Sequence, residues 1–324
     1  MKIFERQVTV EKKSYGNHNI FIRYCCSFIF SWMIHLPFAS AMESNAVKHI
    51  YDLPGSKDIS LNLPSDIAIA PDGRIYVVDG GQHRIVIFKS NGKVDEIIGT
   101  KGSEKGQFLY PIGIAIDNEG QVYVADSGNN RIQIFDDDED FVREFIVKEG
   151  DRKIKPVDIA ISNDRKTLYV TGNNNHKVML FDSRGKSLGQ WGKQGNSSGE
   201  FRYPATIAVG KDNKVYVVDV LNSRVQIFEP DGSLHITAGE WGVKPGQLFR
   251  PKGVALDQKD NVYISDSYLD VIQVFNNETR FIYVLGENGN PAKFVAPTGI
   301  AIDSKNRIYV TEMLANKISV YQIK

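Results

Sequence analysis

The chain has 324 residues, of which 42% are hydrophobic and 24% charged, proportions typical of a folded globular protein. Lysine plus arginine number 39, as do aspartate plus glutamate, so the sequence lacks the basic excess that nucleic-acid binding requires. Its two cysteines are adjacent, which excludes a disulfide framework and a cysteine-ligated zinc site. The length suits one large all-β domain with a short appendage.

The N-terminal segment, residues 1–41, differs from the rest of the chain. A polar lead with basic residues precedes an uncharged run over residues 24–41, which ends in Ala39-Ser40-Ala41. This order predicts a secretory signal peptide with a small-residue cleavage site. The alternative is an uncleaved membrane anchor formed by residues 24–41, because eighteen uncharged residues reach the lower limit for crossing a bilayer. We therefore expect an exported protein, periplasmic or extracellular, which contacts a membrane only if this segment is retained.

Residues 42–324 contain six sequence repeats. Each repeat begins with a proline and a short run rich in Ile, Val and Ala, and successive prolines lie 47, 45, 48, 47 and 46 residues apart. The six prolines are Pro64, Pro111, Pro156, Pro204, Pro251 and Pro297. In every repeat a second run contains a tyrosine and a third ends in an aromatic residue, and five repeats add a weaker fourth run. Four short apolar runs in each unit of about 46 residues predict the antiparallel strands of a propeller blade.

The first and third runs of a repeat differ in pattern. The first run is apolar at consecutive positions around a central alanine, as in Ile114-Ala115-Ile116, which predicts an innermost strand buried on both faces. The third run alternates, as in Ile132-Gln133-Ile134-Phe135, which predicts a strand nearer the rim.

The two ends of the repeat region predict how the ring closes. The sixth repeat stops at Lys324 after its third run, whereas residues 47–53 resemble the fourth runs and precede Pro54-Gly55. An N-terminal strand that completes the last blade would close the ring and remove an exposed sheet edge. We therefore expect residues 42–324 to form an all-β, six-bladed β-propeller of four-stranded antiparallel blades.

The segment Pro111–Phe135, PIGIAIDNEGQVYVADSGNNRIQIF, resembles the NHL repeat, and the other five repeats are recognisable variants of it. Linkers such as Gly106-Gln107-Phe108 resemble those of bacterial members of the family. The resemblance covers residues 47–324 and implies the propeller fold. NHL propellers include lyases, exported binding proteins, protein-interaction modules and RNA-binding domains of ubiquitin ligases, so the resemblance assigns no single function.

Opposite charges recur at the turn between the second and third runs of three repeats. The pairs are Asp79 with Arg84, Asp126 with Arg131, and Asp219 with Arg224. A functional interpretation would place a ring of guanidinium groups around an anionic ligand. A pair that recurs from blade to blade, however, is expected to stabilise the fold that all blades have in common. We therefore interpret these residues as structural pairs that brace their own turns.

The sequence predicts no catalytic residue, no metal site and no cofactor. In the zinc-dependent peptide-amidating lyases that this fold resembles, the zinc-binding histidines directly follow the first proline of a blade, and none of the six repeats has histidine there. His83 and His176 occupy equivalent turns, but two histidines do not complete a tetrahedral zinc site. Asp66 and Asp158 are equivalent acids near the start of repeats one and three, and two acids are too few to predict a calcium site.

The loops between blades and the turns between second and third strands are expected on one face of the ring. They contain aromatic residues, arginines and histidines, which are common in protein interfaces. The candidate binding residues are His83, Asn130, His176, Tyr203, Asn222, Arg250, Tyr268 and Lys317. The alternative is that the loop aromatics fill the gaps between blades. Residues that break the repeat pattern, such as His176 and Tyr268, are the stronger candidates for specificity.

Three functions remain open on this sequence. The favoured one is an exported, non-catalytic scaffold that binds a protein or an extended ligand on this face. The second is a lyase or hydrolase at the mouth of the central channel, which rests on analogy of fold. The third is an RNA-binding or ubiquitin-ligase-associated module. The near-neutral charge and the lack of a preceding Cys/His zinc domain disfavour it, so we expect no nucleic-acid partner.

Overall fold

The computed structural model describes residues 47–55, 59–287 and 290–324, which form β-strands connected by turns and short 3₁₀ segments. The expected signal peptide or anchor, residues 1–41, lies outside these described residues, so export and cleavage stay predictions. Within the described ranges, no helix is long and apolar enough to cross a membrane.

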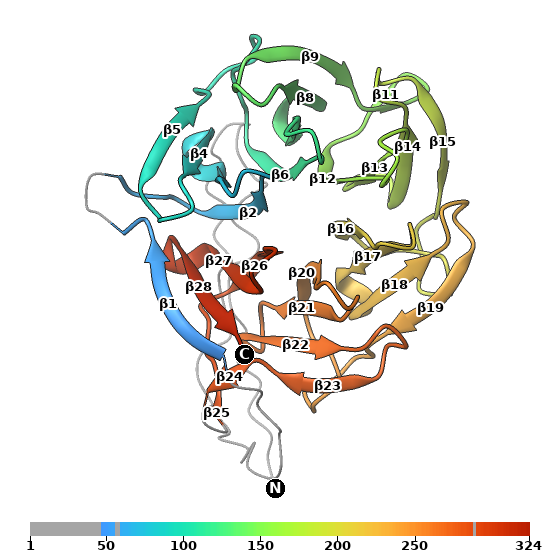
Figure 1. Ribbon diagram of the computed structural model, residues 1–324. Helices are drawn as coiled ribbons and strands as arrows, with labels where there is room; N and C mark the ends of the chain where they lie inside the picture. The colour runs from blue at the N-terminus through green and yellow to red at the C-terminus, as the bar shows by residue number, and fades with distance from the viewer. Residues whose placement is uncertain (1–46, 56–58, 288–289) are drawn as a thin grey trace, which may run out of the picture. The chain divides into compact units, whose positions relative to one another are not determined.

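Six four-stranded antiparallel sheets follow one another along the chain (Figure 1). Blade 1 contains β2 (Pro64–Ile69), β3 (Ile75–Asp79), β4 (Arg84–Phe88) and β5 (Val94–Ile98). Blade 2 contains β6 (Pro111–Ile116), β7 (Val122–Asp126), β8 (Arg131–Phe135) and β9 (Phe141–Ile146). Blade 3 contains β12 (Pro156–Ile161), β13 (Leu168–Gly172), β14 (Lys177–Phe181) and β15 (Ser187–Trp191).

The second half of the ring repeats this plan. Blade 4 contains β16 (Pro204–Val209), β17 (Val215–Asp219), β18 (Arg224–Phe228) and β19 (Leu234–Ala238). Blade 5 contains β20 (Pro251–Leu256), β21 (Val262–Asp266), β22 (Val271–Phe275) and β23 (Phe281–Val284). Blade 6 contains β26 (Pro297–Ile302), β27 (Arg307–Glu312), β28 (Lys317–Ile323) and β1 (Val47–Leu53). Two-stranded ribbons, β10 (Lys148–Glu149) with β11 (Arg152–Lys153) and β24 (Gly286–Glu287) with β25 (Asn290–Pro291), lie in two linkers.

The ring closes as the sequence predicts. β1 pairs antiparallel with β28, with Val47 opposite Ile323 and Leu53 opposite Ile318, so the last blade contains strands from both ends of the repeat region (Figure 1). The inner strand of blade 1, β2, contacts the inner strands of blades 2 and 6, and the contacts continue around all six inner strands. This closure confirms the predicted six-bladed propeller and leaves no blade with an unpaired fourth position.

The hydrophobic core lies between neighbouring blades. One cluster joins Tyr76 and Ile87 of blade 1 to Val124 and Phe135 of blade 2, and the linker residue Phe108 completes it with no exposed surface. Phe201 and Leu248 occupy the matching position in two other clusters. For these linker residues the gap-filling alternative is therefore correct, and each large apolar side chain buried here contributes about 1.5–3 kcal/mol of transfer free energy.

One detail of the expected strand environment is wrong. The inner strands are not buried on both faces, because they surround a central cavity of about 260 Å³ into which residues such as Ala115 and Ile116 are partly exposed. The third strand lies nearer the rim than the first two, as its alternation predicts, and its polar residue Gln133 is fully buried. Its side-chain amide donates to Gln107 O at 2.7 Å and accepts from Gly106 N at 2.9 Å, which fixes the preceding linker.

Candidate functional site

The turns between second and third strands and the linkers between blades lie together on one side of the ring, which we call the loop face. Direct backbone hydrogen bonds join them: Gly128 N donates to Leu109 O at 2.7 Å and Leu221 N donates to Arg202 O at 3.1 Å. The turns of the loop face are residues 80–83, 127–130, 173–176, 220–223, 267–270 and 313–316. The sequence-based expectation that both sets of segments share a face therefore describes the structure correctly.

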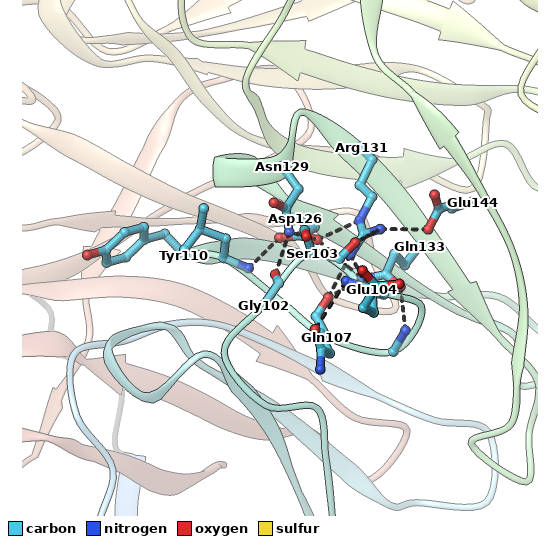
Figure 2. Close-up of polar contacts among 12 residues, drawn as sticks. Gly102, Ser103, Glu104, Gln107, Tyr110, Asp126, Asn129, Arg131, Gln133 and Glu144 are labelled. Carbon is cyan, nitrogen blue, oxygen red and sulfur yellow. Dashed lines mark hydrogen bonds and ion pairs between the residues drawn. The ribbon is translucent and has the colours of Figure 1, made fainter.

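The turn of blade 2 shows how a repeated charge pair is used (Figure 2). Asp126, fully buried, accepts from Arg131 Nε and Asn129 Nδ2 at 2.8 Å and from Leu109 N at 2.7 Å. Arg131 also donates to Glu144 and to the carbonyl groups of Ser103, Glu104 and Gln107, all within 2.9 Å (Figure 2). The pair thus ties the turn, the outer strand and the incoming linker into one network.

The other predicted pairs have the same geometry. Arg84 Nε lies 2.8 Å from Asp79, and Arg224 Nε lies 2.9 Å from Asp219. Burial raises the pKa of both aspartates above its ordinary value. The hydrogen bonds to the carboxylates lower the pKa, but the effect of burial is larger. Because each arginine also donates to carbonyl groups of its own linker, these guanidinium groups do not form a ring that faces a ligand.

Five of the candidate binding residues have structural contacts in the turns. Four occupy repeat-wide turn positions: His83, Asn130 and His176 have positive φ angles of 56–58°, and Asn222 donates to Asp219 at 2.8 Å. Lys317 lies 2.9 Å from Asp52 and 3.3 Å from Glu312.

The two histidines fix the following linker. His83 Nδ1 accepts from Tyr110 N at 2.9 Å, and His176 Nδ1 accepts from Tyr203 N at 3.2 Å. Burial lowers the pKa of both rings, which favours the neutral imidazole with its proton on Nε2. Their part in ligand binding stays a prediction.

The remaining three candidates, Tyr203, Arg250 and Tyr268, are exposed, and the structure brings Tyr268 into a cluster that the sequence did not reveal. The Tyr268 ring is 60% exposed and stacks on Phe249 with 4.1 Å between ring centroids and 25° between planes. Trp241, 71% exposed, also contacts Phe249, with 6.1 Å between ring centroids. We call Trp241, Phe249 and Tyr268 the aromatic platform; Arg250 directly follows Phe249.

Trp241 was missed, although the repeats contain a signal for it. In equivalent linkers, parallel β-bridges pair Lys101 with Phe108, Gln194 with Phe201, and Trp241 with Leu248. An exposed tryptophan therefore replaces a polar residue in one linker. The second residue of the turn between the second and third strands also changes in the half of the ring that contains Trp241. It is Gly81, Gly128 and Asn174 in blades 1–3 but Leu221, Tyr268 and Leu314 in blades 4–6.

A second unusual feature lies at the central cavity. Asp66 on β2 and Asp158 on β12 are 7% and 4% exposed and both line the cavity. Asp66 Oδ2 accepts from Ile114 N at 3.0 Å, and Asp158 Oδ2 accepts from Ile207 N at 2.9 Å. The two carboxyl groups are close enough for the charge of Asp66 to raise the pKa of Asp158, so we call them the acid pair.

The environment of the acid pair favours retention of a proton. Burial raises the pKa of Asp66 to about 7, and burial together with the nearby charge of Asp66 raises the pKa of Asp158 well above its usual range. Asp66 pairs with Val78, two residues before the turn that begins at Gly80, so the acid pair lies at the loop-face end of the cavity. Within the described part of the chain, no group of three or more His, Cys, Asp or Glu residues is placed to hold a metal ion.

Comparisons with known proteins agree with this architecture. The family model of the NHL repeat matches residues 61–88 and 108–135, and a model described as a 6-bladed beta-propeller matches residues 151–240. No curated protein matches the sequence. The chain is therefore a six-bladed β-propeller that carries NHL repeats.

Solved structures show the same fold at low sequence identity. Virginiamycin B lyase from Staphylococcus aureus is 16% identical with a TM-score of 0.60, covering 86% of this chain and 100% of the lyase. A gluconolactonase from Xanthomonas campestris is 15% identical with a TM-score of 0.64, covering 82% and 87%. A protein of unknown function from Bacteroides thetaiotaomicron is 14% identical with a TM-score of 0.66, covering 87% and 73%. At these identities the likeness shows the fold alone.

Proposed function

We propose that this protein is an exported, non-catalytic propeller that binds a partner protein or another extended ligand on its loop face, over blades 4 and 5. The observation that carries the proposal is the aromatic platform. Three large rings lie in one contiguous array, and two of them, Trp241 and Tyr268, expose most of their surface. Exposed aromatic clusters next to an arginine are typical of the residues that dominate binding energy at interfaces.

The backbone of the platform is rigid before any ligand arrives. The buried carboxylate of Asp266 accepts from Phe249 N at 2.6 Å, from Tyr268 N at 3.1 Å and from Leu269 N at 3.0 Å. One fixed group therefore sets the positions of two platform residues that are 19 positions apart in the sequence. A preorganised surface of this kind loses little conformational entropy on binding, which favours affinity.

The test compares the platform with a matched exposed tyrosine on the same face. Partners captured from the envelope and secreted fractions by the wild-type protein are identified, and the affinity of each purified partner is measured. We expect the double variant Trp241→Ala/Tyr268→Ala to weaken binding by about 30-fold or more. Tyr110, which is 46% exposed on blade 2, provides the control variant Tyr110→Ala, and it should keep the wild-type affinity. Equal affinity of the double variant and the wild type would overturn the proposal.

A propeller lyase or hydrolase that acts at the channel mouth is the second candidate. The acid pair favours it, because buried carboxyl groups with a raised pKa are common in general acid–base catalysis. The similar folds named a gluconolactonase and a virginiamycin B lyase supply two substrates to try, a sugar lactone and a streptogramin B antibiotic. Turnover of either that is lost in Asp66→Asn would establish this candidate, and absence of turnover would favour the binding function.

A further inference from the structure

The acid pair is unusual among the inner strands, which are otherwise almost entirely uncharged. All six inner strands are described, and their only charged residues are Asp66, Asp158 and Lys252. At the same position as the two acids, blades 2, 5 and 6 have glycine and blade 4 has Thr206. Two acids at equivalent positions of non-adjacent blades, 92 residues apart in sequence, are not required by the repeat, because four other blades fold without them.

The second oxygen of each carboxyl group points to a position without a side chain. A Cβ atom on Gly113 would lie 2.4 Å from Asp158 Oδ1, and a Cβ atom on Gly299 would lie 2.4 Å from Asp66 Oδ1. Asp158 Oδ1 is buried, and no N–H or hydroxyl group of the described residues donates to it. A carboxylate oxygen in this state is unfavourable unless a proton or a cation compensates it, so the site is complete only with one of them.

The rest of the cavity has the opposite character. Isoleucine, alanine and valine side chains from all six inner strands line it below the acid pair, and its volume of about 260 Å³ equals that of roughly eight or nine water molecules. The cavity therefore combines a doubly acidic end at the loop face with an aliphatic wall. A ligand that matches both parts has one compact positive group on an apolar chain.

We propose that the central cavity binds a primary ammonium group carried on an aliphatic chain, with the ammonium between Asp66 and Asp158 and the chain against the aliphatic wall. An ammonium group has three donors and no acceptor, so it can satisfy both carboxylates at once. Calcium would need six to eight oxygen ligands, whereas the described residues place no third acidic or histidine side chain beside the pair. The inference does not rest on the proposed function of the loop face.

Binding of the cation is linked to loss of a proton. Burial raises the pKa of both carboxyl groups and so favours a proton on the pair. This proton has to leave to solvent when the ammonium group enters, so we expect affinity to increase as the pH rises through about 7. The polar groups of the other inner strands at this end are Ser65 on β2, Thr206 on β16 and Thr298 on β26, which do not titrate in this range, and Lys252 on β20.

Calorimetric titration of the full chain tests the site with n-hexylamine as the probe and 1-hexanol as its uncharged analogue. We expect hexylamine to bind at least about tenfold more tightly than hexanol, and to bind more tightly at pH 8 than at pH 6. Asp158→Asn should weaken hexylamine about 10- to 100-fold, whereas Asp231→Asn, which removes an exposed acid from an outer turn, should have no effect. Near-ultraviolet circular dichroism confirms that each variant is folded.

Further arms of the experiment separate the ligand sources and the competing explanations. Binding of N-acetyl-lysine methylamide as tight as that of hexylamine indicates the lysine side chain of a partner, whereas binding of hexylamine alone indicates a free amine. Lys252→Met should keep or raise the affinity for amines.

Three outcomes would each overturn the proposal. These are equal binding of hexanol and hexylamine, displacement of the amine by calcium chloride, and amine binding that is seen only in Lys252→Met. Binding of hexylamine should be unchanged in the platform variant Trp241→Ala/Tyr268→Ala, so failure here is distinguishable from failure of the proposed function.

Discussion

The equivalent turns of blades 2 and 5 solve the same structural problem with different side chains. In blade 2, Asp126 is held by Arg131, and the arginine also anchors the linker through three carbonyl groups. In blade 5, Asp266 is held by backbone N–H groups alone, and Val271 occupies the position of the arginine. In both blades a buried glutamine, Gln133 or Gln273, still binds the linker backbone.

The difference shows which parts of the repeat are replaceable. The aspartate and the glutamine keep their contacts with the linker, so the fold depends on them in both blades. The arginine of blade 2 has no counterpart in blade 5, where the turn instead presents Tyr268 to solvent. A blade can therefore fold without the arginine and carry an exposed aromatic residue in the same turn. A binding function can be added at such a turn without loss of the fold.

The largest expected effect tests the turn of blade 2. Arg131→Ala should lower the free energy of unfolding by about 3–5 kcal/mol, because the arginine is 5% exposed and its loss leaves the buried Asp126 without its counter-charge. Urea denaturation followed by circular dichroism measures this change. Arg184→Ala, at an exposed turn of blade 3, is the control and should change stability by less than about 0.5 kcal/mol. A small effect of Arg131→Ala would show that backbone donors suffice in blade 2 as well.

The next effect extends the comparison to the inner strands, where Asp66 and Asp158 depart from the glycine of other blades. Because the pKa of Asp66 is raised to about 7 in the folded protein, the folded state binds more protons than the unfolded chain between about pH 4 and pH 7. The contribution of the pair to stability is therefore greatest at low pH and is lost as the pH rises through about 7. Asp66→Asn should remove this loss, which is on the order of 2–4 kcal/mol. The stability of the variant relative to the wild type should therefore be higher at pH 8 than at pH 5.

Denaturation curves at several pH values check this prediction. The difference between Asp66→Asn and the wild type isolates the acid pair, because every other titrating group is common to both proteins. A difference in stability that stays constant from pH 5 to pH 8 would contradict the raised pKa.

A smaller effect is expected at the turn histidine of blade 3. His176→Ala should destabilise the protein by about 1–2 kcal/mol, because alanine at a φ of 56° is strained and the hydrogen bond from Tyr203 N is lost. His176→Gly removes the same hydrogen bond without the strain, so thermal unfolding should rank it between His176→Ala and the wild type. The opposite ranking would exclude backbone strain as the reason.

The smallest expected effect on stability is at the platform. Tyr268→Ala should change the free energy of unfolding by less than about 0.5 kcal/mol, because the side chain is 60% exposed and the backbone around it is held by Asp266. The same variant should weaken partner binding, which separates a surface role from a framework role. A loss of stability as large as that of His176→Ala would place Tyr268 in the framework of blade 5.

The fold could be predicted from the sequence because its signals are local and repeated. Each blade carries its own proline, its own tyrosine and its own turn residues, and six copies agree even where one copy is weak. The strand β1 was predicted with the observed bounds, residues 47–53, because these residues resemble the fourth runs of the other repeats. Burial was predicted less well, because a sequence pattern does not show that the inner strands surround a cavity.

The sequence by itself thus determined the number of blades, their strands, the closure of the ring and the identity of the turn pairs, since each depends on residues close together or on the repeat period. Only the tertiary structure decided that Asp66 meets Asp158 and that Trp241, Phe249 and Tyr268 form one platform. These residues come from different blades and linkers, and the curvature of the ring sets the distances between them. No periodic pattern encodes such distances, because the residues that form each site are those in which one blade differs from the next.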